Sequence, residues 1–69
     1  MAARGRLRAW IADRGPCFVH DGHTATGGSA KWGKGKPLEK KYGNVLAFVG
    51  KHRDIFMIKG MPKRVRLTA

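Results

Sequence analysis

The side chains of this chain that could do chemistry are its lysines and arginines. They outnumber the carboxylates by fifteen to four and give a formal charge of +11 over 69 residues. A folded protein this small and this positive repels itself at neutral pH unless a polyanion supplies the missing negative charge. Lys and Arg bind phosphate oxygens, and such contacts dominate the affinity of proteins for nucleic acids. The composition therefore favours a nucleic-acid-binding protein.

The basic residues fall into four groups along the chain. An ordinary solvated surface mixes both signs of charge, and here acids are scarce. We expect these groups to contact RNA phosphates, and Trp32 either to stack on an exposed base or to fill the small core. The predicted RNA-binding residues are Arg4, Arg6, Arg8, Lys31, Trp32, Lys34, Lys36, Lys40, Lys41, Lys51, His52, Arg53, Lys63, Arg64 and Arg66.

Two other groups of polar residues indicate different chemistry, and neither is complete. Residues 28–34 match the G-x-x-x-x-G-K part of a phosphate-binding loop, but Gly35 stands where a hydroxyl for magnesium is required. His20 and His23, with Cys17, could supply metal ligands, but their spacing matches no known metal motif. The four acids form no close pair suited to acid–base catalysis. We therefore expect no metal, no cofactor, no small-molecule substrate and no enzyme activity.

The remaining compositional signals concern the compartment. Cys17 is the only cysteine, so the chain forms no internal disulfide, and beside Phe18 its thiol is expected to be an inert hydrophobe. No apolar run approaches the roughly 18–20 residues that span a membrane. The arginine-rich, acid-free start up to Ala12 is typical of a mitochondrial transit peptide, but we favour a basic arm that binds phosphate, and the two interpretations are compatible.

The apolar runs predict a mostly β fold: a small antiparallel sheet of two hairpins with extended basic termini and a long basic loop. Residues 6–12 alternate like a strand, although their Ala, Leu and Arg content would also suit a short helix. After a turn at 13–16, residues 17–19 are expected to pair with that strand. The apolar runs 45–49 and 55–58 are expected to form the second hairpin.

The rest of this single small RNA-bound domain, residues 1–69, is expected to be irregular. Its parts are a basic arm or first strand at 1–12, an irregular basic loop at 20–36, a turn or extended connector at 37–42, and a basic tail at 60–69, in which 63–67 could form an edge strand. The expected core residues are Leu7, Ile11, Phe18, Val19, Val45, Leu46, Phe48, Val49, Ile55, Phe56 and Ile58.

The order of these segments resembles a known family. A basic start at 6–8 precedes a segment with Phe and Val at 15–19, and a Lys-Pro-Leu-Glu-Lys-Lys-Tyr segment occupies 36–42. A basic tract and a last apolar run follow at 51–59. This order resembles the small zinc-free form of the bacterial-type large-subunit ribosomal protein thirty-three family, including its mitochondrial members. The resemblance implies a small antiparallel sheet bound to large-subunit ribosomal RNA near the exit site.

From these signals we expect a structural constituent of a ribosome, mitochondrial rather than cytoplasmic. It would bind and neutralise folded ribosomal RNA through Lys and Arg contacts to phosphate. Its partners would be ribosomal RNA and neighbouring ribosomal proteins, with no membrane span. Two alternatives remain open: an accessory structural subunit of a mitochondrial membrane complex, whose charge would meet anionic lipid, and a small DNA-packaging protein.

Overall fold

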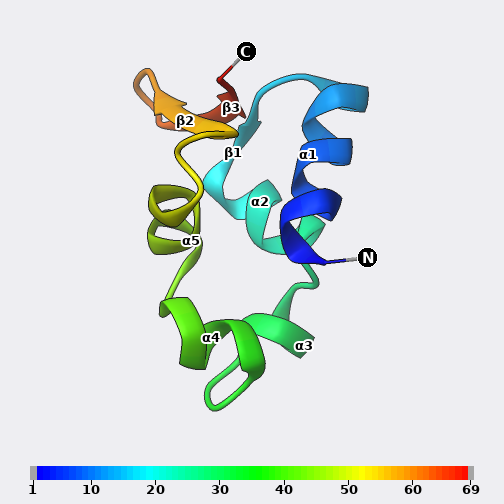
Figure 1. Ribbon diagram of the computed structural model, residues 1–69, viewed down its shortest axis with the longest axis vertical. Coiled ribbons are helices and arrows are strands. Elements are labelled where there is room, and N and C mark those ends of the chain that lie inside the picture. The colour runs from blue at the N-terminus through cyan, green and yellow to red at the C-terminus, as the bar shows by residue number, and fades with distance from the viewer. Residues whose placement is uncertain (1, 69) are drawn as a thin grey trace.

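The computed structural model describes residues 2–68, and more than half of them lie in helices. The elements in chain order are α1 Ala3–Arg14, β1 Cys17–Phe18, α2 Val19–Ala25, α3 Ser29–Trp32, α4 Pro37–Tyr42, α5 Val45–Lys51, β2 Phe56–Lys59 and β3 Arg64–Leu67 (Figure 1). Within residues 2–68 there are five helices and three short strands in one sheet. The predicted mostly β fold is therefore wrong, and so is the small antiparallel-sheet fold that the family resemblance implied.

The sheet has the strand order β1-β3-β2, and both pairs of neighbours are antiparallel. Val65 in the central strand is paired with Cys17 on one side and Ile58 on the other. Two hairpins were expected. Over residues 2–68 one hairpin is found, the pair β2–β3. The basic tail expected at 60–69 is, as far as residue 68, a turn and the central strand.

The basic arm or strand expected at 1–12 is the packed helix α1 from Ala3 onward, and Met1 lies outside the described residues. Leu7 and Ile11 are four residues apart, so a helix places both on one face, where they are buried. A strand would have buried Ala9 beside them, yet Ala9 is exposed. Helix propensity and the spacing of the two large apolar residues outweigh the alternation.

The apolar run 45–49, expected to be a buried strand, forms the helix α5. Asn44 caps this helix, because its Oδ1 accepts a hydrogen bond of 2.9 Å from the backbone N–H of Ala47. Val45, Phe48 and Val49 follow helical spacing and are buried, whereas Leu46 is 39% exposed. A short continuous apolar run does not by its period distinguish a buried strand from a helix, and here the cap decides.

The segments expected to be a loop at 20–36 and a connector at 37–42 contain three helices, α2, α3 and α4. In α2, Gly22 faces α5 so closely that a Cβ there would lie 3.2 Å from Cγ1 of Val45. Pro37 occupies the first turn of α4, where its missing N–H costs nothing. These helices carry few large apolar residues, which is why the sequence looked irregular.

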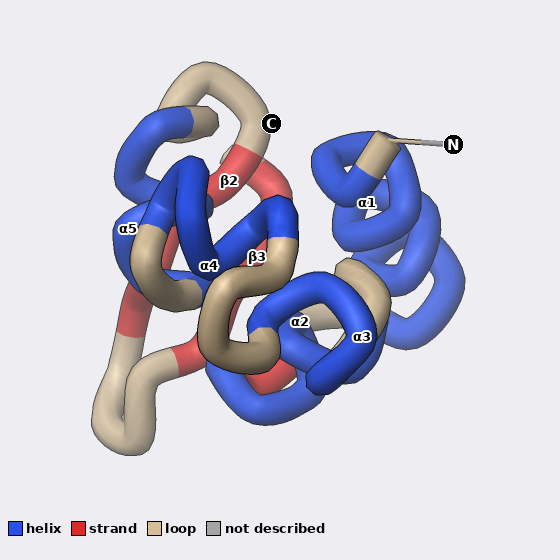
Figure 2. Tube along the Cα trace, turned by 90° about the horizontal axis from the view of Figure 1, so that it is seen from below, coloured by secondary structure: helices blue, strands red, loops and turns tan. Residues whose placement is uncertain are grey.

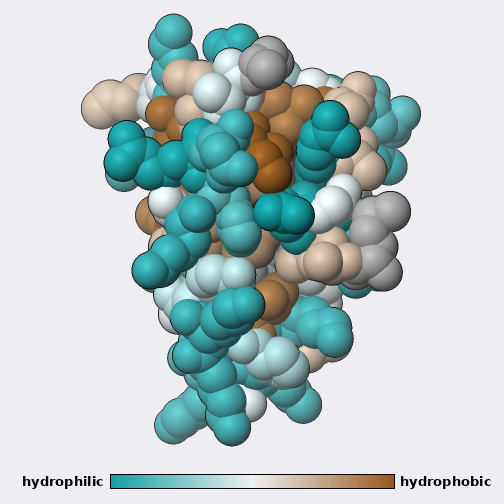
Figure 3. All heavy atoms as spheres, viewed as in Figure 1, coloured by the Kyte–Doolittle hydropathy of each residue, from teal (hydrophilic) through white to brown (hydrophobic). Residues whose placement is uncertain are grey.

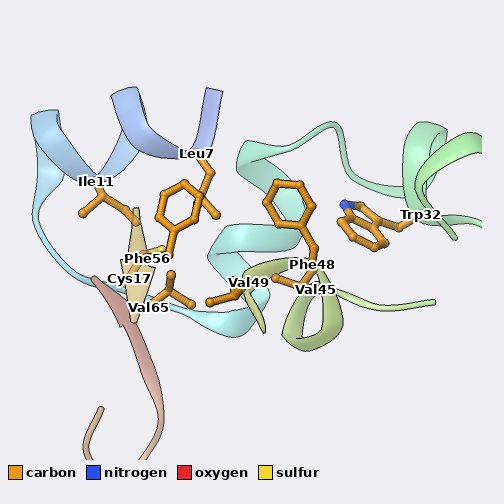
Figure 4. Packing of buried hydrophobic residues seen from close by; sticks show 9 residues of the cluster. All are labelled: Leu7, Ile11, Cys17, Trp32, Val45, Phe48, Val49, Phe56 and Val65. Carbon is orange, nitrogen blue, oxygen red and sulfur yellow. The ribbon is translucent and has the colours of Figure 1, made fainter. Parts of the chain in front are cut away.

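Helices α1, α2 and α5 pack on one side of the sheet, and α3 and α4 lie at the opposite end of the molecule (Figures 1 and 2). Leu7 and Ile11 point from α1 toward Phe56, and Trp32 lies beyond Phe48 at the other end of the core (Figure 4). None of the helices described between residues 2 and 68 is long and apolar enough to cross a membrane.

Most of the expected core is confirmed. The buried apolar residues are Leu7, Ile11, Cys17, Trp32, Val45, Phe48, Val49, Phe56 and Val65. Of the expected members, Val19, Ile55 and Ile58 are half-buried, while Phe18 and Leu46 are exposed and were wrongly placed in the core. Cys17 and Val65 were missed: Val65 lies between two arginines, and at 17–19 the larger neighbours Phe18 and Val19 were assigned to the core instead of Cys17.

The cap of α5 allows a test of its helical assignment. Replacing Asn44 by Ala removes the acceptor for the Ala47 N–H and should lower the free energy of unfolding by about 1 kcal/mol. Asn44→Asp keeps an acceptor and should match the wild type in chemical denaturation followed by circular dichroism. Equal stability of Asn44→Ala and Asn44→Asp would contradict the capped helix.

Candidate nucleic-acid interface

All fifteen Lys and Arg side chains are exposed. Over residues 2–68 a single ion pair forms, between Arg14 and Asp13 at 3.6 Å, and both side chains are mostly exposed, so it contributes little. Two of the four carboxylates accept hydrogen bonds from backbone instead: Asp21 from Phe18 at 3.4 Å and Glu39 from Gly35 at 3.0 Å. The positive charge is thus left without internal compensation.

One end of the molecule concentrates lysine. α3, α4 and the turn between them form the lower end in Figure 1, and the surface there is mostly hydrophilic in Figure 3. This lysine-rich end consists of Lys31, Lys34, Lys36, Lys40 and Lys41. Glu39 is its one acid, and the bond from Gly35 to the Glu39 carboxylate closes the turn before α4. The segment that was expected to be a flexible basic loop is therefore an ordered, strongly positive surface.

α1 brings a second predicted group toward the first. Arg4, Arg6 and Arg8 extend from the exposed sides of α1, while Leu7 is buried. Arg4 and Lys41 line the same hollow of about 270 Å³, whose wall includes aromatic side chains of α4 and α5. Arg4 therefore lies beside the lysine-rich end, whereas Arg8 lines a different hollow, together with Asp54, Ile55 and Leu67.

The third group splits by role. Lys51 and Arg53 are exposed at the end of α5, but His52 is half-buried. The His52 ring lies edge-on to Phe48 at 4.8 Å between centroids, and its Nε2 is 3.4 Å from the hydroxyl of Tyr42. The structure thus places His52 in an aromatic cluster, where its contacts are with protein.

The fourth group lies on the sheet. Because side chains alternate along a strand, the burial of Val65 turns Arg64 and Arg66 to the opposite, exposed face, and Lys63 lies in the preceding turn. Sequence reasoning missed three members of this face, Met57 and Lys59 on β2 and Phe18 on β1. The sequence did not show that β1 is paired with β3, which buries Cys17 opposite Val65 and so turns Phe18 outward.

Trp32 was predicted either to stack on a base or to fill the core, and the structure shows the second. It is 7% exposed, and its Nε1–H donates a 2.6 Å hydrogen bond to Oγ1 of Thr26. The Thr26 hydroxyl donates in turn to the carbonyl of Gly22 at 2.8 Å. Trp32 thus anchors the lysine-rich end to α2 and the core.

His20 and His23 face one another with ring centroids 6.4 Å apart. In residues 2–68 no group of three or more His, Cys, Asp or Glu side chains is arranged to hold a metal ion. Residues 28–34, which partly match a phosphate-binding loop, comprise the N-cap of α3, α3 itself and the turn after it, and the element directly before them is the helix α2 and not a strand.

Comparison with known proteins adds no relative: no protein family, no curated protein and no solved structure matches this chain.

The buried hydrogen bond of Trp32 allows a test of whether this residue stabilises the fold. Thr26→Val leaves the indole N–H without an acceptor and should lower the free energy of unfolding by about 1–3 kcal/mol. Thr26→Ser keeps the hydroxyl and should lose less. Denaturation curves measure both, and a Thr26→Val protein as stable as Thr26→Ser would contradict the anchoring role.

Cys17 gives a second prediction. Burial, and secondarily the negative charge of Asp21, raise the pKa of its thiol above the ordinary 9.0. Alkylation should therefore be slow in the folded protein and fast in urea. The unfolded thiol ionises first as pH rises, so stability should fall above about pH 9. Equal alkylation rates with and without urea would contradict this.

Proposed function

We propose that the protein is a structural constituent of a ribosome that binds and neutralises folded ribosomal RNA. The observation that carries the proposal is the complete exposure of fifteen cations with one weak internal ion pair across residues 2–68. The positive charges on such a surface repel one another, and contacts with phosphate reduce this repulsion. The same surface supports a structural role, because most of its positive residues lie on packed helices and strands.

The distribution of charge favours folded RNA over the alternatives. The lysine-rich end and the exposed face of the sheet lie at opposite ends of a body 31 Å long. A flat lipid surface can meet one of these ends at a time. Folded RNA can surround a small protein and bring phosphates to both ends together.

Two features of the sequence support a ribosomal and mitochondrial setting. The segment order resembles a ribosomal protein family with mitochondrial members, although the fold is mostly helical and not the small antiparallel-sheet fold that this resemblance implied. The arginines of α1, with no acid before Asp13, also suit a mitochondrial address. Neighbouring ribosomal proteins would then be further partners.

The proposal predicts steep salt dependence. If about eight phosphate contacts form, log K for a structured RNA should fall with log salt at a slope of about −7. Fluorescence anisotropy of a labelled ribosomal RNA hairpin across a KCl series measures this slope. Anionic vesicles and duplex DNA serve as competitors. Stronger binding to cardiolipin vesicles than to RNA, or equal affinity for DNA and RNA, would favour the alternatives.

The lysine-rich end can be tested separately. Replacing Lys34, Lys36 and Lys40 together by Ala should flatten the slope by about 2–3, because each lost contact removes about 0.9. The matched control replaces the same three residues by Arg, which keeps the charge and should keep the slope. An unchanged slope in the Ala variant would remove this end from the interface.

The ribosomal setting is tested in the cell. The tagged protein should co-sediment with a ribosomal subunit in a sucrose gradient and leave that fraction after RNase treatment. Persistence in a membrane or DNA fraction that RNase does not change would overturn the assignment to the ribosome.

A further inference from the structure

The exposed face of the sheet carries an aromatic ring among cations. Cys17, Val65 and Ile58 share a row that faces the helices, so their strand neighbours face outward. The outward side chains are all exposed, and we call them the sheet platform: Phe18, Met57, Lys59, Arg64 and Arg66. The exposure of these five side chains leaves the platform open, although Met57 also lines a hollow with Val49 and Gly50 of α5.

The strand register fixes the layout of the platform. Phe18 is paired with Arg64, and Arg64 with Lys59, so these three stand in one row across the sheet. Met57 and Arg66 are paired in the next row. Neighbouring strands lie about 4.8 Å apart, so an extended chain of phosphates crossing the strands would meet these cations in turn.

Phe18 is the aromatic side chain of the platform, and it lies on the edge strand β1. It is 43% exposed, although it stands beside the buried Cys17 and could have been polar without loss to the core. The guanidinium carbon of Arg64 lies 5.0 Å from the centroid of the Phe18 ring, an attractive cation–π contact that holds charge beside an accessible aromatic surface. No carboxylate in the described residues pairs with Lys59, Arg64 or Arg66.

We propose that the sheet platform binds an unpaired stretch of RNA, with a nucleobase stacked on Phe18 and phosphates at Arg64, Arg66 and Lys59. The inference rests on the proposed RNA-binding function and names the kind of RNA that this face takes. An apolar ring adds nothing to the binding of a duplex, whose bases are already stacked. An unpaired base offers its π-face, and stacking on an aromatic side chain contributes about 1–3 kcal/mol per base. Met57 supplies a flexible apolar contact beside the ring.

The test compares binding of the full-length protein to a short labelled single-stranded RNA and to an RNA hairpin whose loop is a non-nucleotide linker, so that all of its bases are paired. Phe18→Ala should weaken single-strand binding about 5- to 100-fold and leave hairpin binding within about twofold. Its salt slope should not change, because no charge is lost. Arg64→Ala should instead flatten the single-strand slope by about 0.7.

Two variants serve as controls. Phe18→Tyr keeps a stacking ring and should bind like the wild type. Leu46→Ala removes another exposed apolar side chain, on α5 and away from the platform, and should also leave affinity unchanged. Circular dichroism melts of each variant verify that the fold is retained, which the exposure of Phe18 leads us to expect.

The outcomes separate this inference from the proposed function. Wild-type hairpin binding together with unchanged single-strand affinity of Phe18→Ala would overturn the platform and leave RNA binding intact. Failure of the wild type to bind any RNA would overturn both. Polyglutamate tests an acidic protein surface as the occupant. If Phe18→Ala weakens polyglutamate binding as much as RNA binding, the platform is not a base-stacking site.

Discussion

A row of three buried aromatic rings joins the two ends of this molecule. Trp32 lies edge-on to Phe48 with centroids 6.0 Å apart, and Phe48 lies 6.3 Å from Phe56. Trp32 belongs to the lysine-rich end and Phe56 to the sheet, so the row connects regions whose surface charges repel each other. The hydrogen bond from Trp32 to Thr26 fixes the orientation of the indole ring at the outer end of the row. The other elements pack around this connection.

The same row explains how a chain of 69 residues keeps fifteen cations exposed on a folded body. A chain of this size buries only about 60% of its unfolded surface, so it has little stability to set against repulsion. The three aromatic residues of this row lie inside. Basic residues lie on every element except the short β1 and the helix α2, so their mutual repulsion is spread over the surface. The interior therefore contains no lysine or arginine, and all fifteen of these residues lie on the surface.

Part of this structure could be predicted from the sequence. The basic groups and most core residues follow from residue type alone, and β2 follows from its apolar run. The helices were missed for local reasons: the cap at Asn44 and the spacing of Leu7 and Ile11 were outweighed by apolar runs that fit either state. The positions of Trp32 and Phe18 depend on partners distant in the chain or in the sheet. The sequence analysis therefore assigned the exposed Phe18 to the core, and it considered the buried Trp32 for stacking on a base.

The central position of β3 has a consequence for the order of events in folding. β1 at Cys17–Phe18 is paired only with β3, which lies near the other end of the chain. During synthesis β3 is made after all the other described elements, so the sheet closes only after residues 64–67 have left the translating ribosome. Pairing over so long a separation is slow because the intervening chain must first be closed into a loop. A nascent chain that stops short of Arg64 thus lacks Val65 of the core, and its first strand remains without a neighbour.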